Sequence, residues 1–280
     1  MSPVAPRLLA VDLDGTLISR GGQPHEADVL ALRAARDAGV VVTIVTGRLY
    51  SGTHIAAEAL GLEGPLGCAD GSHIVHAATG ATLAHTSIRG QDAARLRSHL
   101  EAREVTTFLF AQDAIVHDEA GDDFVHYVRT WSPRLERAAR VLEHRAWHHD
   151  EGVTAVVAVA DEARIGETTA SIRRELAHAA QVLSFPIGHT GLWGLLTRSQ
   201  GIDKGTALRF IAQHAAVPLE ATVAVGDWLN DVPMFRAAGR SFCMGQAPDE
   251  VKAAATDVLS ETAEGGGGIA RVVREVFGVR

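Results

Sequence analysis

A short apolar segment that ends in two carboxylates constrains this chain more than any other feature. Residues 8–11 (LLAV) are apolar without a helical period, which predicts a strand buried on both faces of a parallel sheet. The motif DLDGT follows at once, at residues 12–16. Ligands of open α/β sheets bind beyond the carboxyl ends of the strands, so we expect Asp12 and Asp14 at a functional site. An EF-hand calcium loop would need further oxygen ligands and a closing Glu, which the next residues do not supply.

Strand and helix signals alternate in the first and last thirds of the chain. Apolar and β-branched runs predict further buried strands, and apolar stripes that end at Gly or before Pro predict helices. The expected strands are 8–11, 40–45, 66–69, 222–225 and 241–244, and the expected helices are 26–38, 51–60, 204–216, 232–238, 248–255 and 269–277. This alternation predicts an α/β fold built on a doubly wound, Rossmann-like parallel sheet.

The middle of the chain shows a different, mixed pattern. A hairpin signal at 74–85 is followed by helices and strands in irregular order. The expected helices are 91–102, 123–128, 133–142 and 162–180, and the expected strands are 105–110, 115–117, 153–160, 182–187 and 192–196. We therefore expect an α+β cap domain at residues 81–189, inserted between two parts of a core domain at residues 1–80 and 190–280.

Composition limits the partners and the compartment. The 280 residues are 46% hydrophobic and 21% charged, as in soluble globular proteins. A net charge of −8 without a basic stripe argues against nucleic acid or an anionic membrane surface as partner. Cys68 and Cys243 have neither metal-binding nor disulfide spacing, which indicates a reducing compartment. No apolar stretch approaches the ~20 residues of a membrane span. The first strand follows Met1 too closely for a signal peptide, so we expect a cytoplasmic protein. Its oligomeric state stays open between monomer and homodimer.

Other polar groups at expected strand ends and helix starts complement the two acids. These candidates are Thr46, Gly47, Lys204, Asp227, Asn230 and Asp231. Oxygen-rich side chains suit Mg²⁺ rather than zinc, whereas a hydroxyl, a backbone amide and a lysine suit a phosphate dianion. Each group alone has an ordinary explanation as a turn residue, a solvated lysine or a helix cap. Together at one edge of a sheet they indicate a magnesium and phosphate site.

The order of these motifs, DxDGT, T-G-R, Lys and GDxxND, resembles the four motifs of the haloacid dehalogenase (HAD) superfamily of phosphohydrolases. The stretch from Asp14 to Thr46 is too short for a lid, whereas the stretch from Asp70 to Lys204 has room for one. This arrangement resembles the Cof-like subfamily, which includes sugar phosphatases. The chain departs from that subfamily at residues 70–72, where DGS replaces the usual Asn-Gly-Ala. The resemblance implies a Mg²⁺-dependent phosphatase that acts on a small phosphorylated metabolite, such as a sugar phosphate.

The resemblance also implies a role for each motif residue. Asp12 would attack phosphorus and form an aspartyl-phosphate, and Asp14 would protonate the leaving oxygen and then activate water. The inserted domain would exclude water and select the leaving group. Asp231 and Asn230 would either orient their neighbours or bind the ion directly. The implied metal ligands are Asp12, Asp14, Asp227 and Asp231, and the implied phosphate or substrate ligands are Thr46, Gly47, Arg48, Lys204 and Asn230.

Two alternatives stay open beside hydrolysis. The same fold could transfer the phosphoryl group to a sugar, as a phosphomutase or phosphotransferase, and such an enzyme would require a bisphosphate. A receiver-like signalling module also places acids, Thr and Lys around Mg²⁺, and it would stay phosphorylated without hydrolysis. Asp14, two residues after Asp12, and the long insertion argue against the receiver.

Overall fold

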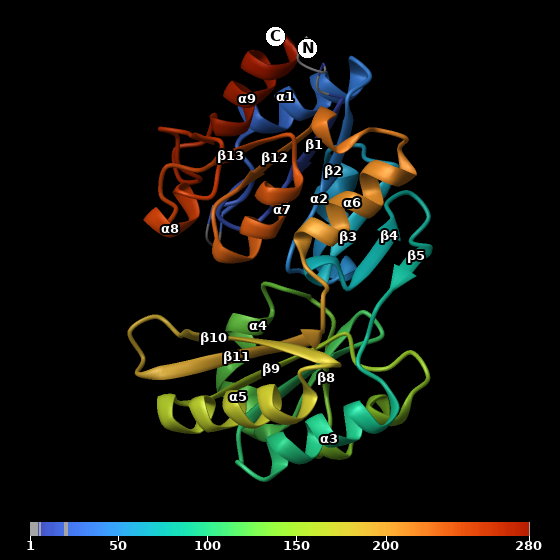
Figure 1. Cartoon of the computed structure of the whole chain (residues 1–280), viewed down its shortest axis with the longest axis vertical. Coiled ribbons are helices and arrows are strands. Elements are labelled where there is room, and N and C mark those ends of the chain that lie inside the picture. Colours follow the sequence, from blue (N-terminus) through green and yellow to red (C-terminus); the bar gives the residue numbers. More distant parts are fainter. Residues whose placement is uncertain (1–4, 6, 20–21, 280) are drawn as a thin grey trace. The chain divides into compact units, whose positions relative to one another are not determined.

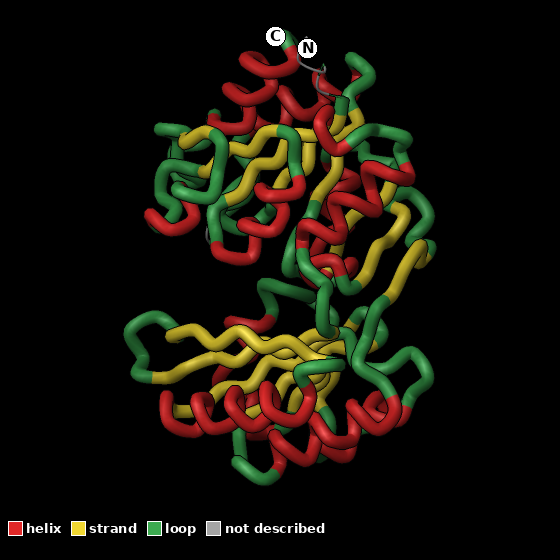
Figure 2. The backbone as a smooth tube through the Cα atoms, viewed as in Figure 1, coloured by secondary structure: helices red, strands yellow, loops and turns green. Residues whose placement is uncertain are grey.

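The computed structural model of the chain describes residues 5, 7–19 and 22–279 (Figures 1 and 2). The chain divides into two compact units, a core unit (1–47, 53–83 and 203–280) and an insert unit (48–52 and 84–202). The border expected near 81 lies close to residue 84 of this division. The border expected near 189 falls instead at 202, because the strand β11 (Leu192–Ser199) pairs with two strands of the insert unit. The prediction drawn from Met1 lies outside the described residues.

A parallel sheet forms the centre of the core unit. Its strand order is β14-β13-β12-β1-β2, and every neighbouring pair is parallel. A parallel bridge between Val45 and Gly67 places β3 next to β2, and β3 also opens a three-stranded sheet, β3-β4-β5. This order confirms the predicted doubly wound fold. The strands are β1 (Leu8–Val11), β2 (Val41–Ile44), β3 (Pro65–Cys68), β4 (His73–His76), β5 (Thr82–His85), β12 (Thr222–Gly226), β13 (Arg240–Cys243) and β14 (Asp257–Val258).

Helices cover both faces of the core sheet (Figure 1). The helices are α1 (Glu26–Asp37), α2 (Tyr50–Ala59), α6 (Lys204–His214), α7 (Val232–Ala237), α8 (Asp249–Lys252) and α9 (Gly268–Val272), the last continued by a π-helical turn at Val273–Phe277. α1 packs against α9 on one face, and α6 packs against α7 on the other. α1 buries Leu32 and Ala35 and ends before Gly39, whose φ of +88° suits a glycine after a helix.

A buried carboxylate of α1 caps the N-terminal end of α9. Asp28 is 1% exposed and accepts hydrogen bonds from the backbone N–H groups of Gly267 at 2.9 Å and Ala270 at 2.8 Å. The first N–H groups of a helix have no partner within the helix, and the helix dipole favours negative charge there. Asp28 therefore caps α9 from a position 239 residues before Gly267 in the chain.

Replacing Asp28 with Ala is expected to lower the free energy of unfolding by about 2–3 kcal/mol, because two backbone N–H groups lose a charged acceptor. Urea denaturation of the purified variant measures this change. Glu26→Ala removes an exposed acid from the same helix and should change the free energy by less than about 0.5 kcal/mol. Equal stability of the Asp28 variant and the wild type would show that the cap contributes nothing.

A six-stranded sheet forms the insert unit, in the order β10-β11-β9-β6-β7-β8. Neighbouring strands are antiparallel, except that β7 and β8 are parallel. α3 packs against α5, and α5 packs on β9, β10 and β11. Besides β11, the elements are β6 (Thr106–Ala111), β7 (Ala114–His117), β8 (Leu135–Arg137), β9 (Ala155–Asp161), β10 (Ala180–Pro186), α3 (Gly90–Glu101), α4 (Val125–Val128) and α5 (Glu162–Leu176).

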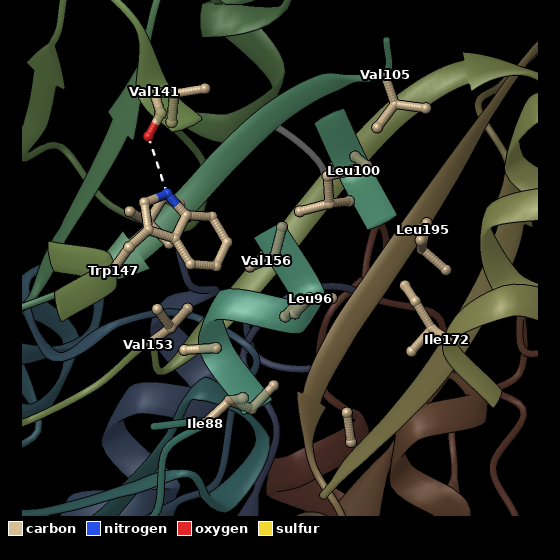
Figure 3. Packing of buried hydrophobic residues seen from close by; sticks show 14 of the residues in the cluster. Ile88, Leu96, Leu100, Val105, Val141, Trp147, Val153, Val156, Ile172 and Leu195 are labelled. Atoms are coloured by element: carbon tan, nitrogen blue, oxygen red, sulfur yellow. Dashed lines mark hydrogen bonds between the residues drawn. The ribbon is translucent and has the colours of Figure 1, made fainter. Parts of the chain in front are cut away.

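The insert unit has its own hydrophobic core (Figure 3). Leu96 and Leu100 from α3 and Ile172 from α5 are buried there with Trp147. The indole N–H of Trp147 donates a hydrogen bond to the carbonyl of Val141 at 3.0 Å, as the figure shows. A fully buried indole needs such a partner, so the loop before β9 is fixed to the core by both packing and hydrogen bonding.

The helix predicted at residues 133–142 is wrong. The segment forms the short strand β8 and a 3₁₀ turn at Val141–Glu143. Its backbone bonds to β7 instead of to itself: the N–H of Ala138, for example, donates to the carbonyl of His117 at 2.8 Å. Pairing with a neighbouring strand overrides the weak local preference for a helix.

Other helices are shorter than the sequence predicts. The helix expected at 162–180 ends at Leu176, because Ala180 already pairs with Ser199 in the sheet. The helix expected at 248–255 extends only over α8. Among the described residues, none of the helices has the length and apolar character needed to cross a membrane.

Candidate active site

Three neighbouring strands bring predicted site residues to one edge of the core sheet. Val11, the last residue of β1, pairs with the last residue of β2 and with Val225 of β12. Asp12 follows directly, and its N–H continues the ladder by donating to the carbonyl of Val225 at 3.0 Å. Thr46 and Asp227 each come two residues after the partners of Val11, so all three follow the carboxyl ends of parallel strands.

Lys204 joins two of the motifs through direct contacts. Its ammonium donates hydrogen bonds to Oδ1 of Asp12 and to Oδ1 of Asp231, each at 2.6 Å. Only 1% of Lys204 is exposed. The lysine is the first residue of α6, which Asp203 caps by accepting a hydrogen bond from the N–H of Thr206 at 2.8 Å. A defined helix start therefore holds the ammonium at the carboxylates.

Asp231 is held by three donors. Its Oδ1 accepts from Lys204, and its Oδ2 accepts from the backbone N–H groups of Asp227 and Trp228, both at 2.9 Å. A Cβ atom at Gly226 would lie 2.5 Å from Cγ of Asp231, so only glycine fits there. The motif GDWLND thus forms a closed turn in which Asp231 fixes the backbone of Asp227.

The carboxylate of Asp227 lies against the turn that follows Asp14. Gly15 has a φ of +83°, and a Cβ atom there would lie 2.2 Å from Oδ2 of Asp227. The hydroxyl of Thr16 donates to Oδ1 of Asp227 over 3.5 Å, and Nε2 of Gln246 donates to Oδ2 over 3.3 Å. Asp227 is 8% exposed, whereas Asp14 is exposed. The two acids of DLDGT therefore differ: Asp12 is buried and Asp14 is accessible.

Three carboxylates share a small buried volume. One oxygen from each of Asp12, Asp227 and Asp231 lies within 4.8 Å of the others. Burial raises the pKa of Asp12 well above its usual value, Asp231 and Asp227 raise it further, and Lys204 offsets part of the rise. Burial by itself would lower the pKa of Lys204, but Asp12, Asp231 and Asp70 raise it, so the ammonium stays charged. An oxygen-only site with surplus negative charge fits a hard divalent cation such as Mg²⁺.

The structure adds Asp70 to the predicted residues. Its Oδ1 accepts a hydrogen bond from Nδ2 of Asn230 at 2.8 Å, and its backbone N–H donates to the carbonyl of Thr46 at 2.9 Å. Asp70 is buried with a φ of +52°, a left-handed conformation that costs energy for a residue other than glycine. It comes two residues after Cys68, the last residue of β3, and this place beyond a strand end is the signal that could have drawn attention to it. Gln246, after β13, is a second such residue.

The T-G-R motif is divided between the two units. Thr46 is fully buried in the core unit. Gly47 lies against Asp70, since a Cβ atom there would be 3.5 Å from Oδ1 of Asp70. Arg48 belongs to the insert unit, where its guanidinium donates to the carbonyl of Gly52 at 3.2 Å. Thr46 and Gly47 are thus grouped with the carboxylates, whereas substrate contact by Arg48 stays a prediction.

Comparison with known proteins identifies the family. A family model described as haloacid dehalogenase-like hydrolase matches residues 9–273. The chain is 28% identical over 261 residues to the pyridoxal phosphate phosphatase YbhA of Escherichia coli, covering 91% of this chain and 93% of the relative. It is 28% identical over 279 residues to the phosphatase YwpJ of Bacillus subtilis, covering 93% and 96%. A solved haloacid dehalogenase-like hydrolase from Bacteroides thetaiotaomicron matches with a TM-score of 0.82 at 20% identity, covering 97% of this chain and 100% of that one. The family model spans nearly the whole chain, and the chain belongs to the haloacid dehalogenase-like hydrolases.

Proposed function

We propose that the protein is a Mg²⁺-dependent phosphatase that hydrolyses the phosphate monoester of a small metabolite through an aspartyl-phosphate intermediate. The observation that carries the proposal is the buried cluster in which Lys204 bridges Asp12 and Asp231 and Asp227 supplies a third carboxylate. In this proposal the cluster supplies a nucleophile, a cation site and a fixed positive charge. Transfer of a phosphoryl group to a carboxylate needs these three things in one place.

Asp12 supplies the nucleophile in this proposal. Lys204 holds Oδ1 of Asp12, so we assign Oδ2 as the oxygen that attacks phosphorus. The bond from phosphorus to the ester oxygen breaks as the new bond to Oδ2 forms, and the exposed Asp14 gives its proton to the leaving oxygen. Asp14 then takes a proton from water, which attacks the phosphorus of the aspartyl-phosphate. Inorganic phosphate leaves, and the carboxylate of Asp12 is restored.

Asp12, the backbone carbonyl of Asp14 and the carboxylate of Asp227 would hold Mg²⁺. Asp231 contributes charge, but three donors occupy its two oxygens, so we assign it to positioning Lys204 and Asp227. When bound, the ion neutralises the surplus charge of the carboxylates and reduces the repulsion between Asp12 and an anionic phosphoryl group.

The phosphoryl oxygens are negatively charged, so they need hydrogen-bond donors that are neutral or positively charged. We assign this role to the hydroxyl of Thr46, the N–H of Gly47 and the ammonium of Lys204, which follow strand ends or begin α6 at the same sheet edge. Asn230 is a fourth donor, and its hydrogen bond to Asp70 fixes the orientation of its amide. Arg48 is assigned to the substrate beyond the phosphate.

The proposed substrates are small phosphorylated metabolites, such as sugar phosphates or phosphorylated cofactors. The relative named for pyridoxal phosphate covers nearly all of this chain, which supports this class. Identity of 28% supports the class of ester rather than that one compound. The proposal is therefore limited to phosphate monoesters of small metabolites, and a substrate screen is needed to identify the compound.

Phosphate release should depend on Mg²⁺. We would incubate the protein with about a hundred phosphorylated metabolites and measure inorganic phosphate, with excess Mg²⁺ or with EDTA. At least one small monoester should be hydrolysed with Mg²⁺. EDTA should reduce the rate to background, and added Mg²⁺ should restore it, because the three carboxylates repel an anionic substrate when no cation is bound.

The same screen tests the alternatives. Hydrolysis that persists in EDTA would contradict the proposed metal site. Phosphoryl transfer that requires a sugar bisphosphate would indicate a phosphomutase. A stable phosphoprotein that releases no phosphate would indicate a receiver-like module.

A further inference from the structure

Gln246 connects three segments of the core unit through one side-chain amide. Its Nε2 donates to the carbonyl of Gly15 at 2.5 Å and to Oδ2 of Asp227 at 3.3 Å. Its Oε1 accepts a hydrogen bond from the N–H of Ala263 at 3.2 Å. The amide thus contacts the turn after β1 and the carboxylate after β12, while Gln246 itself follows β13.

The backbone that carries Gln246 is fixed on both sides. The N–H of Met244 donates to the carbonyl of Gly226 at 3.0 Å, and the N–H of Gly245 donates to the carbonyl of Glu261 at 2.8 Å. Met244 is buried. These bonds hold the start of the loop beside the GDWLND turn, so the direction of the Gln246 side chain is set by ordered neighbours.

The acceptor end of the amide is also held. Ala263, which donates to Oε1, accepts a hydrogen bond at its carbonyl from the ring of His25 at 3.1 Å. Four residues later, Gly267 donates to the buried carboxylate of Asp28. Because His25, just before α1, and Asp28, in its first turn, hold this loop at two points, Gln246 cannot rotate its amide without losing a hydrogen bond to an ordered partner.

We propose that Gln246 is a positioning residue that orients Asp227 and the Asp14–Gly15 turn for Mg²⁺ binding. The inference rests on the proposed function, because it concerns the cation site assigned there. An amide suits this role since it is neutral: it fixes the direction of Oδ2 of Asp227 and of the Gly15 carbonyl without cancelling negative charge. A lysine at the same place would fix the carboxylate and also weaken its attraction for the cation.

The test is the Mg²⁺ affinity of Gln246→Met, measured by titration calorimetry on the whole protein. Methionine has similar length and volume but cannot donate a hydrogen bond. We expect the Kd for Mg²⁺ to rise about 10-fold, the usual effect of removing a hydrogen bond to a metal ligand. The Mg²⁺ concentration for half-maximal activity should rise by the same factor, while KM for the ester at saturating Mg²⁺ stays within about 2-fold.

The matched control is Gln213→Met, an exposed glutamine on α6, which should bind Mg²⁺ as the wild type does. Gln246 is exposed, so loss of its hydrogen bonds should lower the melting temperature in EDTA by no more than about 2–4 °C. Wild-type Mg²⁺ affinity in Gln246→Met would overturn the inference and leave the proposed function standing. A melting temperature in EDTA that falls further than this, in parallel with the affinity, would replace positioning by a structural role. A wild-type protein that binds no Mg²⁺ would overturn the proposed function and this inference together.

Discussion

An Asp12→Asn protein should fold and release no phosphate from any ester that the wild type hydrolyses. The carboxamide oxygen is a poor nucleophile, so no aspartyl-phosphate forms, and kcat should fall by more than about 10³-fold. Initial rates at saturating Mg²⁺ measure this loss. Mass spectrometry of protein quenched during turnover should show added phosphate on the wild type and none on the variant.

The same substitution makes a second, independent measurement useful. Burial and the charges of Asp231 and Asp227 raise the pKa of Asp12, and Lys204 offsets only part of this rise, so an uncharged side chain at position 12 removes repulsion. The melting temperature of Asp12→Asn in EDTA should therefore be no lower than that of the wild type. Asp37→Asn, at an exposed acid on α1, is the control for activity. Full turnover by Asp12→Asn would end the assignment of the nucleophile.

Lys204→Met should damage both activity and stability, whereas Asp12→Asn should damage activity alone. It removes the only charged partner that contacts Asp12 and Asp231 at 2.6 Å among the described residues and leaves two carboxylates buried without it. Breaking a buried ion pair in this way typically costs about 3–5 kcal/mol. Activity should fall by about 10³-fold or more, because the ammonium proposed to stabilise the negative charge of the phosphoryl group is also lost.

Urea denaturation and steady-state rates measure these two effects. Lys252→Met, at the only other lysine of the chain, is the matched control and should keep most of the activity. The double variant Asp12→Asn, Lys204→Met should be more stable than Lys204→Met alone, because one of the unpaired charges is removed with the lysine. If the double variant were less stable than either single variant, the two residues would not be coupled through charge.

The charged residues Asp12, Asp227 and Lys204 can be predicted from the sequence because they follow buried strands or begin a helix. A strand buried on both faces is a continuous apolar run, so the first polar residue after it marks the edge where ligands bind. Asp12 and Asp227 are found in this way, and Lys204 is found at the start of a helix. The contacts of Lys204 with Asp12 show that these separate signals describe one cluster.

The remaining contacts depend on partners that are distant in the chain. Asp70 and Gln246 also follow strands, but a single polar residue in a turn is common in every loop. Asp70 meets Asn230 across 160 positions, and Gln246 meets Gly15 across 231. The strand β8 is missed for the same reason: its backbone is extended because β7 lies beside it, which a local helix pattern does not report.

The pairing of β1 with β12 has a consequence for synthesis on the ribosome. Leu8 pairs with Thr222, so one side of β1 has no partner until a segment about 200 residues later has been synthesised. At ordinary translation rates this synthesis takes roughly 10–40 s. The strands of the insert unit's sheet all lie between Thr106 and Ser199, and they can assemble while the chain is still growing. In that interval the apolar edge of β1 lacks its β12 partner, and unpaired apolar edges of this kind favour aggregation of a nascent chain.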